Sequence, residues 1–187
     1  MNFNDHSKLI GQHAFLSPSN YHWINYDQEK LNRVYLNFLA VEQGTRLHEF
    51  AAEAIRLGIK LPKSKKTLNS FVNDAIGFKM TPEQPLYFSD NCFGTTDAIS
   101  FKNGILRIHD LKTGSTPASM NQLLVYTALF CLEYRFDPND IQVELRIYQN
   151  DEIFITIPEA EQISNIIDKI ILFDKCIDKI REGERND

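Results

Sequence analysis

The chain has 187 residues, of which 43% are hydrophobic and 24% are charged, with a net charge of −5. This size and balance are typical of a single globular domain, which we expect to cover residues 1–187. The negative charge argues against avid, nonspecific nucleic-acid binding, which depends on Lys and Arg meeting phosphates. It leaves room for a clustered carboxylate site, because bound cations cancel such charge locally. No apolar run approaches the roughly 18–20 residues that span a bilayer, so we expect no membrane partner.

Cysteine usage narrows the classes of site further. Cys92, Cys131 and Cys176 are widely separated and form no CxxC pair. The sequence therefore predicts neither a zinc site nor an iron–sulfur cluster. The odd count, together with the lack of a signal peptide, favours a reducing cytoplasm.

The first half of the chain is predicted to be helical. After about 25 irregular residues, apolar spacing predicts helices over 27–40, 43–57 and 67–78. The apolar stripe of the second helix consists of Leu47, Phe50, Ala51, Ala54 and Ile55. Gly58 stands where a C-terminal cap glycine belongs. The four lysines of the next segment, at 60, 63, 65 and 66, form either a solvated loop or a phosphate-contacting patch.

The second half alternates strands and helices. β-branched and aromatic runs predict strands over 85–90, 92–101, 105–113, 140–150 and 152–157, the last two joined through Asn150-Asp151. Helical periods predict a helix over 117–135, with Pro117 in its first turn, and another over 158–181. The order of elements indicates an α/β or α+β fold, with a central mixed β-sheet flanked by helices.

The hairpin within residues 94–114 is the most informative stretch. Asn103-Gly104 between two strand-like runs predicts a two-residue type I′ turn. This turn fixes a register in which paired residue numbers sum to 207, so that Asp97 falls opposite Asp110. Lys112 lies on the same face, at the end away from the turn.

Two aspartates directly opposite one another on a sheet repel each other. The arrangement makes sense if a divalent cation lies between Asp97 and Asp110, or if Lys112 neutralises one of them. Mg²⁺ and Mn²⁺ prefer such oxygen ligands and can activate water for phosphate chemistry. The competing interpretation is a structural Asp–Lys pair near a sheet end, and a β-bulge would break the register.

Four ordered motifs resemble the RecB-like branch of the PD-(D/E)xK nucleases. They are Gly44-Thr-Arg-Leu-His48, Gly94-Thr-Thr-Asp97, Asp110-Leu-Lys112-Thr-Gly114 and Gln122-Leu-Leu-Val-Tyr126. The resemblance covers residues 44–126 and implies a restriction-endonuclease-like sheet. The chain lacks the four cysteines that some relatives use for an iron–sulfur cluster, and it is too short to include the helicase to which many relatives are fused.

The resemblance implies a role for each motif residue. It makes His48, Asp97 and Asp110 metal ligands, with the Leu111 carbonyl as an additional oxygen. Asp97, Asp110 and Lys112 would be catalytic. Gln122, Tyr126 and Thr113 would contact substrate, with Gln122 and Tyr126 also able to hold Lys112 in place. Glu49, beside His48, is either a supporting group or solvated surface.

The resulting expectation is a Mg²⁺- or Mn²⁺-dependent deoxyribonuclease, an exonuclease or end-processing enzyme of recombination, repair or phage DNA metabolism. It would act alone, as a homo-oligomer, or with a helicase, recombinase or single-strand-binding partner. The first alternative is a catalytically inactive nuclease-fold module that binds DNA or protein. The second is a general α/β protein whose motif matches are coincidental.

Overall fold

The computed structural model describes residues 5–184. The chain divides into two compact units, Met1–Gln43 and Gly44–Asp187, and all four motifs lie in the second. The single nuclease domain expected over residues 1–187 remains a prediction. No helix in the described part of the chain combines the length and apolar character that crossing a membrane requires.

The first unit is built from short 3₁₀ turns and the start of a long helix. The turns are η1 (Ser7–Leu9) and η2 (Pro18–Asn25), followed by the N-terminal part of α1 (Gln28–Leu57). Phe15 packs against Tyr35 and Phe38 of the helix, with ring centroids 4.9 and 5.4 Å apart. A hollow of about 650 Å³ lies beside these rings.

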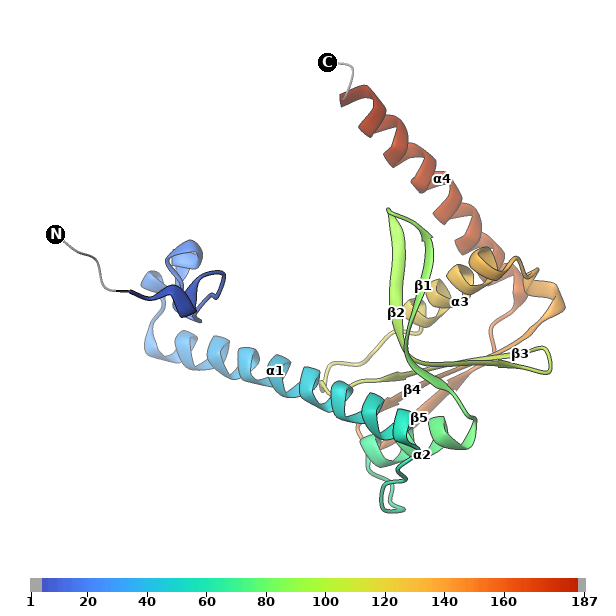
Figure 1. Ribbon diagram of the computed structural model, residues 1–187, viewed down its shortest axis with the longest axis horizontal. Helices are drawn as coiled ribbons and strands as arrows, with labels where there is room; N and C mark the ends of the chain where they lie inside the picture. Colours follow the sequence, from blue (N-terminus) through green and yellow to red (C-terminus); the bar gives the residue numbers. More distant parts are fainter. Residues whose placement is uncertain (1–4, 185–187) are drawn as a thin grey trace. The chain divides into compact units, whose positions relative to one another are not determined.

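The second unit is organised around a five-stranded sheet in the order β1-β2-β3-β4-β5 (Figure 1). The strands are β1 (Thr81–Ser89), β2 (Cys92–Lys102), β3 (Ile105–Leu111), β4 (Gln142–Gln149) and β5 (Glu152–Thr156). β3 and β4 run parallel, and the other neighbours are antiparallel. The expected mixed sheet flanked by helices is confirmed.

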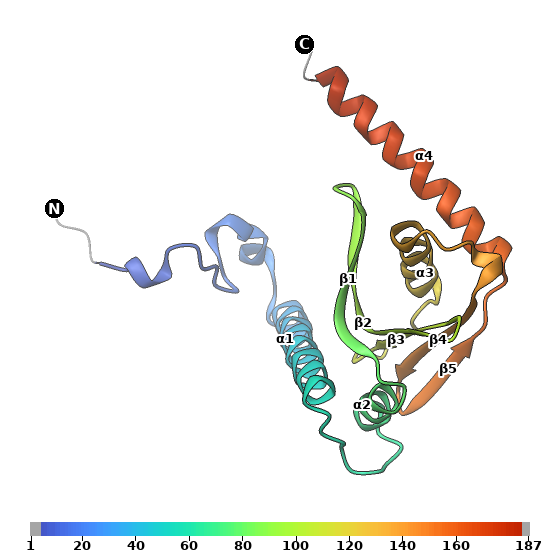
Figure 2. The same ribbon diagram turned by 45° about the vertical axis from the view of Figure 1, so that its right-hand side comes forward.

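Helices cover both faces of the sheet (Figure 2). On one face, α3 (Asn121–Tyr134) and α4 (Ala160–Glu184) contribute to a core with the buried residues Ile99, Leu106 and Ile108. On the other face, α2 (Thr67–Gly77) and the C-terminal part of α1 pack against Ala98, Leu111 and Tyr148. The short helix η3 (Pro138–Asp140) precedes β4. The central strands β3 and β4 are thus covered on both sides, which fixes the positions of their buried side chains.

The predicted type I′ turn at Asn103-Gly104 is present, and the expected connection through Asn150-Asp151 is a second two-residue turn of the same kind. Asn103 and Gly104 have φ values of +53° and +75°, and Asn150 and Asp151 have +53° and +62°. The β2–β3 pairs run from Lys102↔Ile105 to Ala98↔His109, with residue numbers that sum to 207 as expected. The hairpin register predicted from the sequence is therefore confirmed as far as Ala98↔His109, and Asp97 and Asp110 lie one position beyond the last pair.

Several element boundaries were predicted wrongly. The helices expected over 27–40 and 43–57 are one continuous helix, α1, because Gly44 does not interrupt it. Pro117 precedes α3, which begins at Asn121. β1 begins earlier than expected, at Thr81; its Pro82 and Pro85 are tolerated because β1 is an edge strand. Phe50, expected in the buried stripe, is 51% exposed, whereas Ala51, Ala54 and Ile55 are buried.

The face of β3 that carries His109 holds a buried hydrogen-bond network shared with β4 and α2. Tyr148 donates its hydroxyl hydrogen to Asp74 of α2 at 2.7 Å, and Arg146 donates to the same carboxylate oxygen at 3.1 Å. The Tyr148 oxygen lies 3.2 Å from His109 Nδ1. Because Tyr148 gives its hydrogen to Asp74, His109 Nδ1 is the donor in that contact. Burial, followed by the charges of Arg146 and Arg107, lowers the pKa of His109 to about 3.

The buried imidazole of His109 predicts an acid-dependent loss of stability. In the unfolded chain the His109 imidazole is protonated below about pH 6.5, whereas in the folded chain it stays neutral down to about pH 3. Stability should fall by up to about 1.4 kcal/mol for each pH unit over that window. His109→Gln should flatten this part of the profile when unfolding by urea is compared with wild type between pH 4.5 and 7.5. Equal slopes for the two proteins would contradict the prediction.

Candidate metal centre

Asp97 lies where β2 separates from β3. The paired ladder ends at Ala98↔His109, so the backbone of Asp97 lies one position beyond it. Its side chain continues the connection, because Asp97 Oδ2 accepts a hydrogen bond from the backbone N–H of Leu111 at 2.7 Å. Asp97 Oδ1 lies 3.3 Å from His48 Nδ1 of α1. The carboxylate therefore links three elements: α1, β2 and β3.

Three donor groups converge at this point. Donor atoms of His48, Glu83 and Asp97 all lie within 4.8 Å of one another, and all three residues are half-buried. The hydrogen bond to Asp97 raises the pKa of His48 above its usual value, against the opposing effect of burial. Burial and the negative charge of Asp97 raise the pKa of Glu83. The cluster is therefore electrostatically strained in a way that a cation would relieve.

Glu83 was missed by the sequence analysis. The β1–β2 pairs from Thr81↔Ile99 to Tyr87↔Phe93 have numbers that sum to 180, which sets Glu83 beside Asp97. A simple two-residue turn at Asp90-Asn91 would instead give the sum of 181 seen at Ser89↔Cys92, and would set Gln84 there. An irregularity between Tyr87 and Ser89 shifts the register by one. No residue pattern in the sequence predicts that register shift.

Asp110 and Lys112 form a second group next to the cluster. Lys112 Nζ lies 3.1 Å from Asp110 Oδ1 and 3.0 Å from Oδ2. Asp110 is 4% exposed, and its Oδ2 meets no donor among the described residues except this ammonium. Burial raises the pKa of Asp110, the charge of Asp97 raises it further, and Lys112 lowers it.

The helix α3 holds the Lys112 side chain from the other side. Gln122 Oε1 accepts from Lys112 Nζ at 2.8 Å, and Gln122 Nε2 donates to the Tyr126 hydroxyl at 3.4 Å. Tyr126 in turn donates to the Thr95 carbonyl at 2.6 Å. The chain of contacts runs from Asp110 through Lys112, Gln122 and Tyr126 to β2, and the roles that the resemblance implies for Gln122 and Tyr126 remain predictions.

Two motif glycines are explained by close approach. A Cβ on Gly94 would lie 2.9 Å from Tyr126 Cε1, and a Cβ on Gly44 would lie 2.8 Å from Thr113 Oγ1. Each glycine therefore makes room for a side chain of another motif. Thr113 is exposed, beside a hollow of about 220 Å³ that Lys112 also lines.

The loop that follows Lys112 is held by a buried side chain of β4. Gln149 donates to the carbonyls of Gly114 and Thr116 at 2.6 and 2.7 Å, and accepts from the Ala118 N–H at 3.1 Å. Leu111 contributes its N–H to Asp97 and its side chain to the core. The role of the Leu111 carbonyl as a ligand remains a prediction.

The donors fit a hard divalent cation. Carboxylates of Asp97 and Glu83, one imidazole, and the nearby buried oxygen of Asp110 are groups that suit Mg²⁺ or Mn²⁺. Burial and the neighbouring charge of Asp97 raise the pKa values of Glu83 and Asp110, and a divalent cation held by these groups would favour the charged carboxylates. The residues that would hold the ion are His48, Glu83, Asp97 and Asp110.

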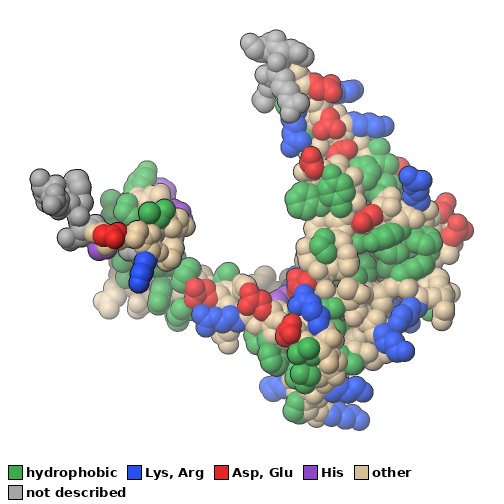
Figure 3. Space-filling view, in the orientation of Figure 1, with side chains coloured by type: hydrophobic (Ala, Val, Ile, Leu, Met, Phe, Trp, Pro, Cys, Tyr) green, Lys and Arg blue, Asp and Glu red, His purple; other side chains and the backbone are tan. Residues whose placement is uncertain are grey.

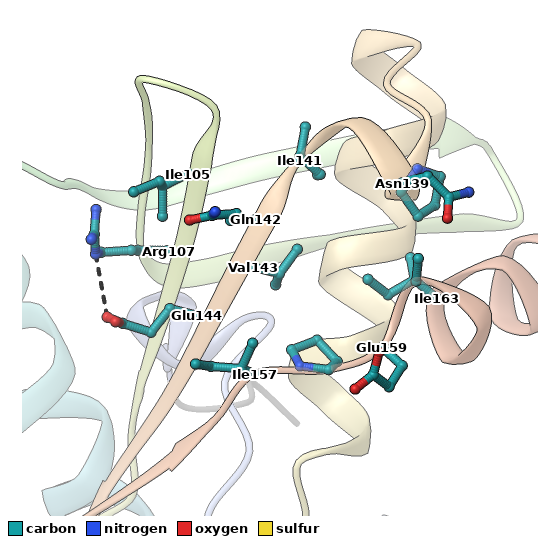
Figure 4. Close-up of a pocket in the computed structure, with 13 residues that line it drawn as sticks. Ile105, Arg107, Asn139, Ile141, Gln142, Val143, Glu144, Ile157, Glu159 and Ile163 are labelled. Carbon is teal, nitrogen blue, oxygen red and sulfur yellow. Dashed lines mark hydrogen bonds and ion pairs between the residues drawn. The ribbon is translucent and has the colours of Figure 1, made fainter.

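Other candidates lie outside this cluster. Glu49 is exposed, as are all four lysines of the segment between α1 and α2; Lys66 pairs with Asp151 at 3.1 Å. A hollow of about 500 Å³ lies at the far end of β3, around Ile105 and the Arg107–Glu144 ion pair (Figure 4). Ile105 and Leu111 are six positions apart along β3, roughly 20 Å, so that hollow is separate from the metal cluster.

The raised pKa of His48 predicts pH-dependent metal binding. An imidazole must lose its proton to coordinate, so Mn²⁺ affinity should fall about tenfold for each pH unit below that pKa. Stability of the metal-free protein should change in the opposite direction, because the His48–Asp97 pair is lost as pH rises through the same pKa. His48→Ala should weaken Mn²⁺ binding and remove the pH slope in calorimetric titrations. His22→Ala, in the first unit, should change neither, and an unchanged slope in His48→Ala would contradict the assignment.

The contact between Gly94 and Tyr126 predicts a steric penalty. Gly94→Ala should cost about 1–3 kcal/mol of unfolding free energy, because the ring of Tyr126 must move. Gly77→Ala is the matched control: nothing lies within 4 Å of its Cβ position, and alanine is the better helix former. Urea unfolding of both variants checks this. Equal stabilities would show that the ring moves without cost.

Comparison with protein-family models and with curated proteins finds no match to this chain. The resemblance to the PD-(D/E)xK nucleases therefore depends on the four motifs and on the geometry that brings them together. Each of six polar motif residues either contacts a residue of another motif or changes the pKa of one. They are His48, Asp97, Asp110, Lys112, Gln122 and Tyr126.

Proposed function

We propose that the chain is a Mg²⁺- or Mn²⁺-dependent deoxyribonuclease that hydrolyses DNA phosphodiester bonds as an exonuclease or end-processing enzyme. The observation that carries the proposal is the fixed Lys112 ammonium, held between Asp110 and Gln122 beside the His48–Glu83–Asp97 cluster. A lysine and clustered carboxylates together suit a reaction in which water attacks a phosphate and charge develops on its oxygens.

The residues of the site would have three different roles: metal binding, charge stabilisation and positioning. His48, Glu83, Asp97 and Asp110 would hold a divalent cation, which when bound supplies positive charge to phosphate oxygens and acidifies water. Lys112, as a fixed cation, would stabilise the negative charge that develops on the phosphate as the P–O bond breaks. Gln122 and Tyr126 restrict the motion of the ammonium, which lowers the cost of placing it at the moment of reaction.

The cellular setting follows from weaker observations. All three cysteines are free, which agrees with action in a reducing compartment such as the cytoplasm. We further propose that a helicase, recombinase or single-strand-binding protein, or a second copy of the chain, supplies DNA handling.

A degradation assay tests the proposal. Linear duplex, linear single-stranded and closed circular DNA are incubated with Mg²⁺, Mn²⁺ or EDTA. Metal-dependent loss of linear DNA is expected, and Lys112→Met or Asp110→Asn should reduce the rate at least about 100-fold. Lys102→Met, an exposed lysine at the other end of β2, is the matched control and should cleave normally.

The substrates separate the alternatives. Loss of linear DNA alone indicates an exonuclease, and loss of circles as well indicates an endonuclease. Wild-type protein that leaves every substrate intact with both metals would overturn the nuclease proposal and favour the nuclease-fold binding module.

A further inference from the structure

The two-stranded ribbon of β1 and β2 extends beyond the metal centre and carries a pair of stacked aromatic rings. Tyr87 and Phe93 are cross-strand partners, with ring centroids 6.3 Å apart and ring planes 26° apart. Tyr87 is 51% exposed and Phe93 is 68% exposed. Figure 3 shows hydrophobic side chains at the surface beside the outer end of this ribbon.

Packing settles which way the rings point. Leu86 is buried in the core shared with α3, and Gly94, its cross-strand partner, lies against Tyr126. Side chains alternate between the faces of a strand, so Tyr87 and Phe93 project from the opposite face. The rings therefore serve no purpose in the α3 core.

The same ribbon face leads to the metal centre. Along β2 the next residue on this face is Thr95, paired with Pro85, and the ladder is then interrupted between Gln84↔Thr96 and Pro82↔Ala98, where Asp97 and Glu83 join the metal cluster. Thr95 and Pro85 are exposed, so the path between the rings and the cluster is open to solvent. Asp97 is four positions from Phe93 along β2, about 13 Å. That distance is roughly four nucleotides at duplex spacing and roughly two in a fully stretched strand.

The surroundings of the rings select bases rather than phosphates. The Tyr87 hydroxyl donates to Asp90 at 3.0 Å, and the Tyr87 N–H donates to Glu133 at 2.9 Å. These carboxylates repel a phosphate backbone, but an unpaired base can stack on a ring with little regard to charge. The hydrogen bond to Asp90 also fixes the ring of Tyr87, so little freedom is lost on stacking.

We propose that Tyr87 and Phe93 form a stacking platform for the bases of single-stranded DNA, two to four nucleotides from the phosphate held at the metal centre. The proposal rests on the proposed nuclease function and adds its substrate class: a strand with an unpaired stretch next to the scissile bond. A duplex has no free base faces to offer this platform.

Binding measurements test the platform without hydrolysis. The probe is a fluorescent single-stranded oligothymidine 12-mer, titrated with full-length protein in Ca²⁺ in place of Mg²⁺. The double variant Tyr87→Ala, Phe93→Ala should bind about tenfold or more weakly than wild type. Tyr87→Leu, Phe93→Leu, which keeps apolar bulk on the ribbon, should lose affinity similarly, whereas Phe93→Trp should retain it. Tyr134→Ala, an exposed aromatic on α3, is the matched control and should bind within twofold of wild type.

An abasic scan locates the contact. Single abasic residues are placed at successive positions from the cut bond, and cleavage of each oligonucleotide is timed with Mg²⁺. The wild-type rate should drop when the missing base lies two to four nucleotides from the bond, and the Tyr87→Leu, Phe93→Leu protein should be indifferent to that position. A wild-type rate that does not depend on abasic position would overturn the proposal.

The outcomes also separate this proposal from the nuclease proposal. Normal cleavage with unchanged oligothymidine binding in the double variants overturns the platform alone. Ring-dependent binding in a protein that cleaves nothing supports the platform and overturns hydrolysis. Wild-type protein that binds no single strand overturns the platform, as does a ring variant whose only change is the loss of a dimer in size-exclusion chromatography.

Discussion

The hydrogen bond from the Leu111 N–H to the Asp97 carboxylate fixes the position of Asp97, and the other groups of the site are arranged around this side chain. β2 pairs with β3 as far as Ala98 and then departs to run with β1 alone. A separating pair of strands exposes backbone donors, and the side chain of Asp97 satisfies one of them at 2.7 Å. Its second oxygen, Oδ1, lies 3.3 Å from His48 Nδ1, and Glu83 is the third member of the same cluster.

The separation of the strands also explains why charged groups persist in a largely buried place. Asp110 is on the buried side, with Lys112 as its counter-charge, while the other carboxylates are half-buried. Removing one member would leave a buried charge uncompensated, which is costly. The two motif glycines, Gly44 and Gly94, contribute to close packing around the site, because each lets a side chain from another motif approach more closely than a methyl group would allow.

The sequence was sufficient for the part of the site governed by local rules. The Asn103-Gly104 turn determined the β2–β3 register, and the four-residue spacing of Gln122 and Tyr126 placed both on one helix face. Glu83 could not be found, because a register shift near the β1–β2 turn decides which residue of β1 faces Asp97. The buried network of Asp74, His109 and Tyr148 was also missed, since polar residues on a strand indicate solvent unless a covering helix supplies partners. The continuity of α1 through Gly44 was likewise hidden, because the interruption of its apolar spacing resembled a break in the helix.

The order in which the site forms on folding follows from how close its parts are in sequence. Six residues of the site fall within 44 consecutive residues, which two hairpins and one loop connect: Glu83, Asp97, Asp110, Lys112, Gln122 and Tyr126. Contacts between residues so close in sequence cost little chain entropy to form. His48 reaches the cluster from a helix that lies earlier in the chain, across the whole of α2. We therefore expect most of the cluster to assemble as a local unit, with His48 as its last donor to arrive. Acquisition of metal affinity during refolding would then report the docking of α1 rather than the pairing of the strands.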